Sequence, residues 1–142
     1  MKNNTKKYTN LLDNVKKSAC ALDDSQSIQS TAADVGFDWN NVSEIIDKLH
    51  EEIDELKVEI KRGDQQAQLD ELGDILFTCV NIARHIGCEA SEAMRYANNK
   101  FTTRFKVVEQ LCQQQGIAMA DTGFDDLLVL WEQAKKLLRD AG

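Results

Sequence analysis

The sequence predicts an all-α fold, a bundle of four to five helices, from three observations. Proline is absent from the 142 residues, where average usage of about 5% would give roughly seven. The chain has only seven glycines as well, so residues that break helices are scarce. Apolar residues recur at steps of three and four, and no segment shows the period-two alternation of a β-strand.

The N-terminal part of the chain gives the weakest helical signal. Apolar residues recur at helical spacing from Tyr8 to Ala19, with lysines on the opposite face. A polar stretch at residues 23–30 weakly interrupts this pattern before Ile28, Ala32 and Val35, and residues 36–41 have the composition of a loop. We therefore expect a first helix over 8–19 and a loop before the next helix.

The clearest helical pattern follows that loop. Asn41 with Glu44 resembles a capping box, and Gly63 is placed to end the helix. Its apolar stripe keeps one face hydrophobic over about five turns. The stripe consists of Val42, Ile46, Leu49, Ile53, Leu56 and Ile60.

Three further apolar stripes predict three more helices. They run over residues 69–86, 90–112 and 124–138, and a glycine follows each of the first two. Thr122 with Asp125 is expected to open the last helix, and basic residues near its end suit the helix dipole.

The net charge of −7 is concentrated in one segment, because residues 44–74 contain eleven acids and four bases. Such an acidic segment argues against direct nucleic-acid binding and attracts cations. A solvated acidic face is the alternative. No apolar run approaches the roughly 18 residues of a membrane span, and the four cysteines lack metal-site spacing. We expect a cytoplasmic protein with reduced thiols and no membrane partner.

Two carboxylate pairs carry the strongest chemical signal. Glu52 and Glu55 are three residues apart, as are Glu71 and Asp74, so each pair shares one helix face. On two antiparallel helices, the four acids can converge, and their repulsion would require a hard cation such as Mg²⁺. The pattern alone leaves a metal site and a solvated face open. The second pair begins a polar stripe of Glu71, Asp74, Thr78, Asn81 and His85.

A basic pair lies on the following helix. Lys100 and Arg104 are four residues apart and therefore on the same side. Two cations at this spacing mildly destabilise an isolated helix, so they are candidates for binding phosphate. An ordinary solvated pair is the alternative.

Six segments together resemble the MazG nucleoside triphosphate pyrophosphohydrolases. They are VGFDW at 35–39, EEIDE at 51–55, DELGDILF at 70–77, VNIARH at 80–85, NNKFTTRF at 98–105 and LWEQAK at 130–135. The likeness spans about residues 28–138 and is closest to the C-terminal catalytic half of two-domain members. It divides the chain into a poorly matched N-terminal helical segment, 1–27, and a MazG-like domain, 28–142.

The resemblance implies an Mg²⁺-dependent (or Mn²⁺-dependent) homodimeric enzyme. Such an enzyme cleaves nucleoside triphosphates between the α and β phosphates, releasing a nucleoside monophosphate and pyrophosphate, as nucleotide-pool housekeeping. The family's metal ligands fall on Glu52, Glu55, Glu71 and Asp74. Its leading glutamate, which orients or deprotonates the attacking water, falls on Glu51, and its phosphate-binding bases fall on Lys100 and Arg104. Weaker matches near the nucleotide are Trp39, Asn81, Asn98 and Trp131, and core packing is an equal alternative for the two tryptophans.

Other functions remain open at the level of sequence. One is a related pyrophosphohydrolase whose substrate range is narrowed to dUTP, dCTP or phosphoribosyl-ATP. Another is a non-catalytic helical dimerisation module, which the complete carboxylate pairs disfavour. The preferred base and sugar, the physiological nucleotide, the number of metals and the choice between dimer and tetramer are not fixed by these patterns.

Overall fold

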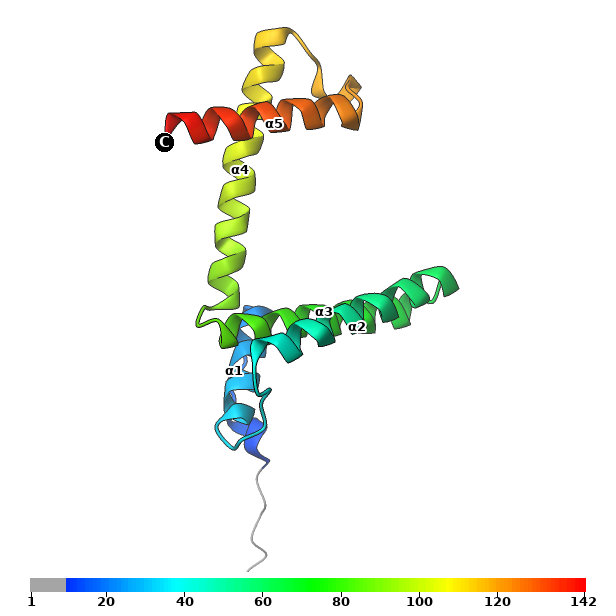
Figure 1. Cartoon of the computed structure of the whole chain (residues 1–142), viewed down its shortest axis with the longest axis vertical. Helices are drawn as coiled ribbons and strands as arrows, with labels where there is room; N and C mark the ends of the chain where they lie inside the picture. The colour runs from blue at the N-terminus through cyan, green and yellow to red at the C-terminus, as the bar shows by residue number, and fades with distance from the viewer. Residues whose placement is uncertain (1–9) are drawn as a thin grey trace, which may run out of the picture. The chain divides into compact units, whose positions relative to one another are not determined.

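The computed structural model describes residues 10–142, and this part of the chain is all-α (Figure 1). It contains five α-helices and two short 3₁₀ turns, with no strand among the described residues. The all-α prediction is therefore confirmed. The chain divides into two compact units, one up to Ala93 and one from Met94 to Gly142, and each is described by itself.

The N-terminal part differs from the prediction. Between residues 10 and 20 only the 3₁₀ turn η1, Leu11–Asn14, is helical, so the helix expected over 8–19 is wrong in its described part. Tyr8 lies outside the described residues. The first α-helix is α1, Ala21–Ala33, which contains the polar stretch that was expected to interrupt helical structure.

Polar side chains of this stretch make hydrogen bonds within α1 and to neighbouring parts of the unit. Ser25 Oγ donates to the Ala21 carbonyl at 2.9 Å, back-bonding one turn within α1. Gln26 contacts the start of α4 through its carboxamide oxygen, which accepts from the Ala90 backbone N–H at 2.8 Å. Polar residues of α1 are thus satisfied by particular partners, which hydrophobic periodicity does not reveal.

Helices α2, Val42–Arg62, and α3, Gln65–His85, form an antiparallel hairpin and lie side by side (Figure 1). The predicted cap of α2 is confirmed, because Asn41 Oδ1 accepts from the Glu44 backbone N–H at 3.0 Å. Gly63 ends α2 with a φ of 74°, in the left-handed region that glycine adopts without strain.

Helix α3 buries two polar side chains beside apolar Val80 and Ala83, while much of its apolar stripe is exposed. Members of the polar stripe lie inside the unit: Thr78 and Asn81 are buried. By contrast Leu69, Leu72 and Leu76 of the apolar stripe are 62%, 45% and 48% exposed. Within the described residues, the hydrophobic face of α3 is therefore largely uncovered.

The second unit contains most of α4, Ala90–Gln115, with the 3₁₀ turn η2, Met119–Asp121, and α5, Phe124–Ala141. The predicted Thr122 cap of α5 is wrong, because Gly123 holds the cap position without a side-chain bond. Thr122 Oγ1 instead donates to the Ala118 carbonyl at 2.8 Å. The buried core of this unit is Val108, Cys112, Leu130 and Ala134.

None of the helices described here is long and apolar enough to cross a membrane.

Candidate active site

The α2–α3 hairpin brings acids from both helices together. Glu52 and Glu55 from α2 and Glu71 from α3 each offer a carboxylate oxygen, and these oxygens all lie within 4.8 Å of one another. Asp74, three residues after Glu71 on α3, is exposed and lies outside this group. We refer to Glu52, Glu55 and Glu71 as the acid cluster.

A lysine that the sequence analysis did not select neutralises part of this charge. Lys48 Nζ lies 2.8 Å from Glu52 Oε1 and 3.3 Å from Glu51 Oε1. Its hydrogen bond lowers the pKa of the Glu52 carboxyl, although burial acts in the opposite direction. Glu51 itself is exposed. The spacing of four residues between Lys48 and Glu52 was the available sequence signal.

Two carboxylate oxygens of the acid cluster remain without compensation. Glu52 Oε2 and Glu71 Oε2 are buried and have no hydrogen-bond partner among the described residues. Burial, followed by repulsion from Glu55 and Glu52, raises the pKa of the Glu71 carboxyl. Hard oxygen donors with uncompensated charge are the ligands that Mg²⁺ and Mn²⁺ prefer, so these residues fit such an ion.

A cavity of about 530 Å³ adjoins the acid cluster, a size typical of small-molecule sites. Glu52 and Asp74 line it, together with two predicted nucleotide residues, Trp39 and Asn81. We call it the hairpin cavity. Thr78 of the polar stripe also lines it, and the remaining lining, to which the sequence analysis gave no individual role, is Leu12, Ile28, Gln29, Ala32, Phe37, Asp38, Lys48, Phe77 and Arg84.

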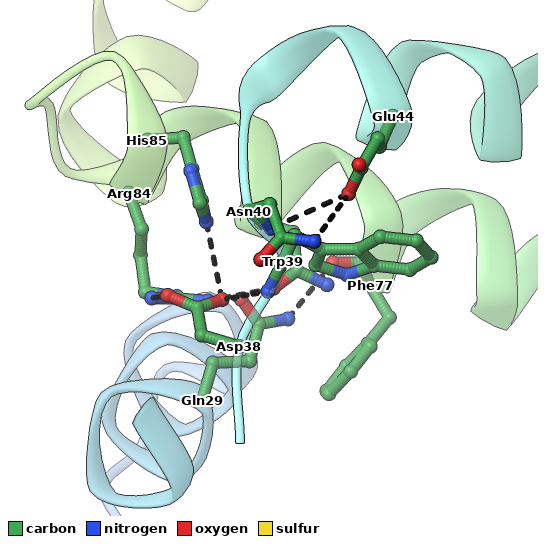
Figure 2. Close-up of polar contacts among 9 residues, drawn as sticks. Gln29, Asp38, Trp39, Asn40, Glu44, Phe77, Arg84 and His85 are labelled. Carbon is green, nitrogen blue, oxygen red and sulfur yellow. Dashed lines mark hydrogen bonds and ion pairs between the residues drawn. The ribbon is translucent and has the colours of Figure 1, made fainter. Parts of the chain in front are cut away.

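Polar contacts fix the loop that borders this cavity (Figure 2). Asp38 accepts from Arg84 Nη2 at 2.8 Å and Nη1 at 3.2 Å, and its Oδ1 lies 3.1 Å from His85 Nε2. The Arg84 hydrogen bonds hold the pKa of the Asp38 carboxyl far below its usual range. The contacts with Arg84 and His85 tie this loop to α3, and Asp38 also accepts from the Trp39 backbone N–H at 2.9 Å within the loop.

Asp38→Asn is expected to lower the free energy of unfolding by about 1 kcal/mol at pH 7. Because the pKa of the Asp38 carboxyl is lowered in the folded protein, its ionised form stabilises the fold at pH values above the ordinary pKa of 3.8. This contribution is lost as the pH falls from 3.8 toward the lowered pKa. The difference between variant and wild type should therefore shrink below that pH. Urea unfolding at pH 7, 5 and 3 measures it, with the exposed Asp34→Asn as the control; a difference that does not change with pH contradicts the account.

The second unit carries the predicted basic pair. Lys100 and Arg104 line a groove of about 630 Å³ between α4 and α5, which Lys135 and Arg139 also line. The Arg104 guanidinium lies over the Trp131 ring, 5.9 Å from its centroid.

The other two predicted residues of this unit have different environments. Trp131 packs against the core of its unit and lies 5.3 Å from the Phe101 ring, measured between centroids. The packing role considered for Trp131 is therefore present in the structure. Asn98 is exposed on α4, outside the lining of the groove.

Comparison with known proteins identifies the family. Residues 40–109 match the model of the MazG nucleotide pyrophosphohydrolase domain. The chain is also 39% identical, over 127 residues, to a nucleoside triphosphate pyrophosphohydrolase of Escherichia coli K12. The chain belongs to the MazG family. The resemblance noted in the sequence is thus confirmed.

The alignments with three similar proteins show what share of each protein this chain covers. The Thermotoga maritima protein named nucleoside triphosphate pyrophosphohydrolase/pyrophosphatase MazG is 35% identical over 130 residues, which is 92% of this chain and 50% of that protein. The Escherichia coli match covers 88% of this chain and 48% of the relative. This MazG chain therefore spans about half the length of these two curated relatives. Bacillus subtilis YabN, described as uncharacterised, is 41% identical over 69 residues, 49% of this chain and 14% of that protein.

Proposed function

We propose that this chain hydrolyses nucleoside triphosphates between the α and β phosphates, releasing a nucleoside monophosphate and pyrophosphate, in nucleotide-pool housekeeping. The observation that carries the proposal is that Glu52 and Glu71 each bury an oxygen with no hydrogen-bond partner among the described residues, and that Glu52 lines a cavity large enough for a nucleoside. The names of the Escherichia coli and Thermotoga maritima relatives support it. A non-catalytic helical module would have no use for two uncompensated buried carboxylate oxygens.

In this proposal the four acids Glu52, Glu55, Glu71 and Asp74 hold Mg²⁺, or Mn²⁺ in its place. When bound, the ion supplies charge neutralisation at the phosphate oxygens and activation of water. Lys48 keeps the Glu52 carboxylate ionised and fixes its direction through the 2.8 Å contact. Glu51, exposed beside Lys48, orients the attacking water or takes its proton.

The remaining predicted residues bind the nucleotide. Trp39 and Asn81 line the hairpin cavity, where an aromatic face and an amide suit a nucleobase. Lys100 and Arg104 bind phosphate oxygens and stabilise the charge of the leaving pyrophosphate. Asn98 and Trp131 are assigned weaker contacts near the nucleotide. We propose that residues 28–142 act as one functional domain that follows residues 1–27.

The expected products are a nucleoside monophosphate and pyrophosphate, with neither diphosphate nor orthophosphate as a primary product. Attack at the α phosphorus makes pyrophosphate the leaving group. Phosphorus NMR of reactions with the four canonical triphosphates, dUTP and dCTP, with Mg²⁺, tests this and shows whether the substrate range is narrow. A primary orthophosphate signal would rule out the proposed reaction.

We also propose that the chain acts as a homodimer, with a tetramer as the higher alternative. The support is the apolar face of α3, on which Leu69, Leu72 and Leu76 are exposed in the single chain. Light scattering at micromolar concentration should give at least twice the monomer mass of 16.0 kDa. A fully active monomer under these conditions would refute the dimer.

A further inference from the structure

Arg84 is hydrogen-bonded to three separate parts of the first unit. Its Nε donates to Gln29 Oε1 of α1 at 3.0 Å, and its two terminal nitrogens donate to Asp38 of the loop. Nη2 also donates to Asn81 Oδ1, on the preceding turn of α3, at 2.8 Å. Figure 2 shows Gln29, Asp38 and Arg84 converging from helix and loop. The Arg84 side chain is only 11% exposed, so solvent competes weakly for these bonds.

This arrangement fixes the direction of the Asn81 amide. A guanidinium only donates hydrogen bonds, so the Asn81 atom that faces Arg84 must be the oxygen and the NH₂ group must point elsewhere. Among residues 10–142 that NH₂ group has no hydrogen-bond partner, while Asn81 is only 8% exposed and lines the hairpin cavity. Asn81 therefore offers a hydrogen-bond donor to whatever occupies the cavity.

The other neutral amide and hydroxyl side chains in the cavity lining each donate a hydrogen bond within the unit. Gln29 accepts from Arg84 and donates to the Phe77 carbonyl at 2.9 Å, and Thr78 Oγ1 donates to the Asp74 carbonyl at 2.7 Å. Asn81 differs from both, because neither hydrogen of its NH₂ group has a partner among residues 10–142 and Arg84 fixes the direction of that group.

We infer that Arg84 is a positioning residue that sets base selectivity, by holding Asn81 as a donor toward an acceptor atom of the nucleobase. This inference rests on the proposed function. The favoured nucleotides are those whose base places a carbonyl oxygen or an unprotonated ring nitrogen at Asn81. Bases that place an amino group there are disfavoured, because two donors would face each other.

Steady-state kinetics with ATP, GTP, CTP and UTP test the inference. In Arg84→Met, the ratio of kcat/KM between the best and worst bases should fall about tenfold, the effect of one hydrogen bond. The change should come through KM, with a smaller change in kcat. Arg84→Lys should behave similarly, because lysine cannot reproduce the fork that reaches three partners. The matched control is Arg62→Met, which removes an exposed ion pair with Glu59 at the end of α2 and should leave the ratio unchanged.

Asn81→Asp provides a second, isosteric test. Aspartate still accepts from Arg84, so the fold is kept, but the donor facing the cavity becomes an acceptor. The order of base preference should then reverse toward bases that present an amino group. Circular dichroism establishes which variants fold. If Arg84→Met does not fold, the kinetics of Asn81→Asp decide the inference.

Two results overturn the inference. One is equal kcat/KM for all four bases in the wild type, and the other is an unchanged ratio between bases in the folded Arg84 variants, whether or not all bases lose activity equally. If the wild type hydrolyses none of the triphosphates, the proposed function fails separately. Calorimetric titration with AMP, GMP, CMP and UMP then measures the same base ratio as affinities, and the same two results decide.

Discussion

Glu71→Gln should lower kcat/KM for triphosphate hydrolysis by about 10²–10³-fold and at the same time raise the metal-free melting temperature. The activity is lost because one carboxylate ligand is removed from a site whose charge stabilisation is worth several kcal/mol. Stability rises because Glu71 Oε2 is buried with no hydrogen-bond partner in the described part of the chain, and burial and neighbouring acids raise the pKa of this carboxyl. A neutral amide removes the repulsion. Pyrophosphate release with Mg²⁺ and thermal unfolding in EDTA measure the two effects.

Glu52→Gln is the informative comparison. It should lower kcat/KM to a similar extent. It should also lower the metal-free melting temperature, because Glu52 is paired with Lys48 at 2.8 Å. Sequence reasoning alone would expect removal of any clustered acid to stabilise the protein, and the Lys48 contact reverses that expectation for Glu52. Asp70→Asn, the exposed neighbour of Glu71, is the control. Wild-type activity in Glu71→Gln, or a lower melting temperature, would contradict the assignment.

Arg104→Ala should reduce kcat/KM by the equivalent of about 2–4 kcal/mol if the guanidinium binds phosphate more strongly in the transition state. Arg104→Lys should lose less, because the charge remains while the planar fork and its stacking on Trp131 are lost. Kinetics of both variants with one good triphosphate measure the difference.

Lys106→Ala is the matched control for this test, because Lys106 is an exposed cation two residues along α4 and therefore on another face. It should leave kcat/KM unchanged. If Arg104→Ala also leaves kcat/KM unchanged and alters stability by no more than about 0.5 kcal/mol, Arg104 is an ordinary surface arginine.

Local signals in the sequence predicted the α2–α3 hairpin well. Asn41 and Gly63 act on their own neighbouring backbone, so their roles can be inferred without the rest of the fold. The spacing of Glu52, Glu55 and Glu71 could be interpreted for the same reason, because a hairpin of two helices brings such positions together.

What the sequence could not predict depends on tertiary contacts. Periodicity shows that α3 has an apolar and a polar face, but the structure is needed to show that Thr78 and Asn81 point inward. The Asp38–Arg84 pair joins residues 46 positions apart, and no spacing rule connects a loop to a helix at that distance. In the described part of the helix expected over 8–19, only Leu11–Asn14 is helical, because apolar spacing alone does not stabilise a short helix.

The Lys48 contact bears on whether the α2–α3 hairpin depends on a metal ion to fold. Its ammonium group lies 2.8 Å from Glu52 and 3.3 Å from Glu51, so the site carries its own counter-charge before any ion arrives. Among the described residues, Glu71 Oε2 is buried with no hydrogen-bond partner, and an added cation would relieve its repulsion from Glu55 and Glu52. If Glu52, Glu55 and Glu71 bind the proposed ion, this counter-charge allows the hairpin to fold before the ion binds. Folding and ion binding would then be successive steps, in contrast to small metal-dependent domains that are unfolded until metal binds.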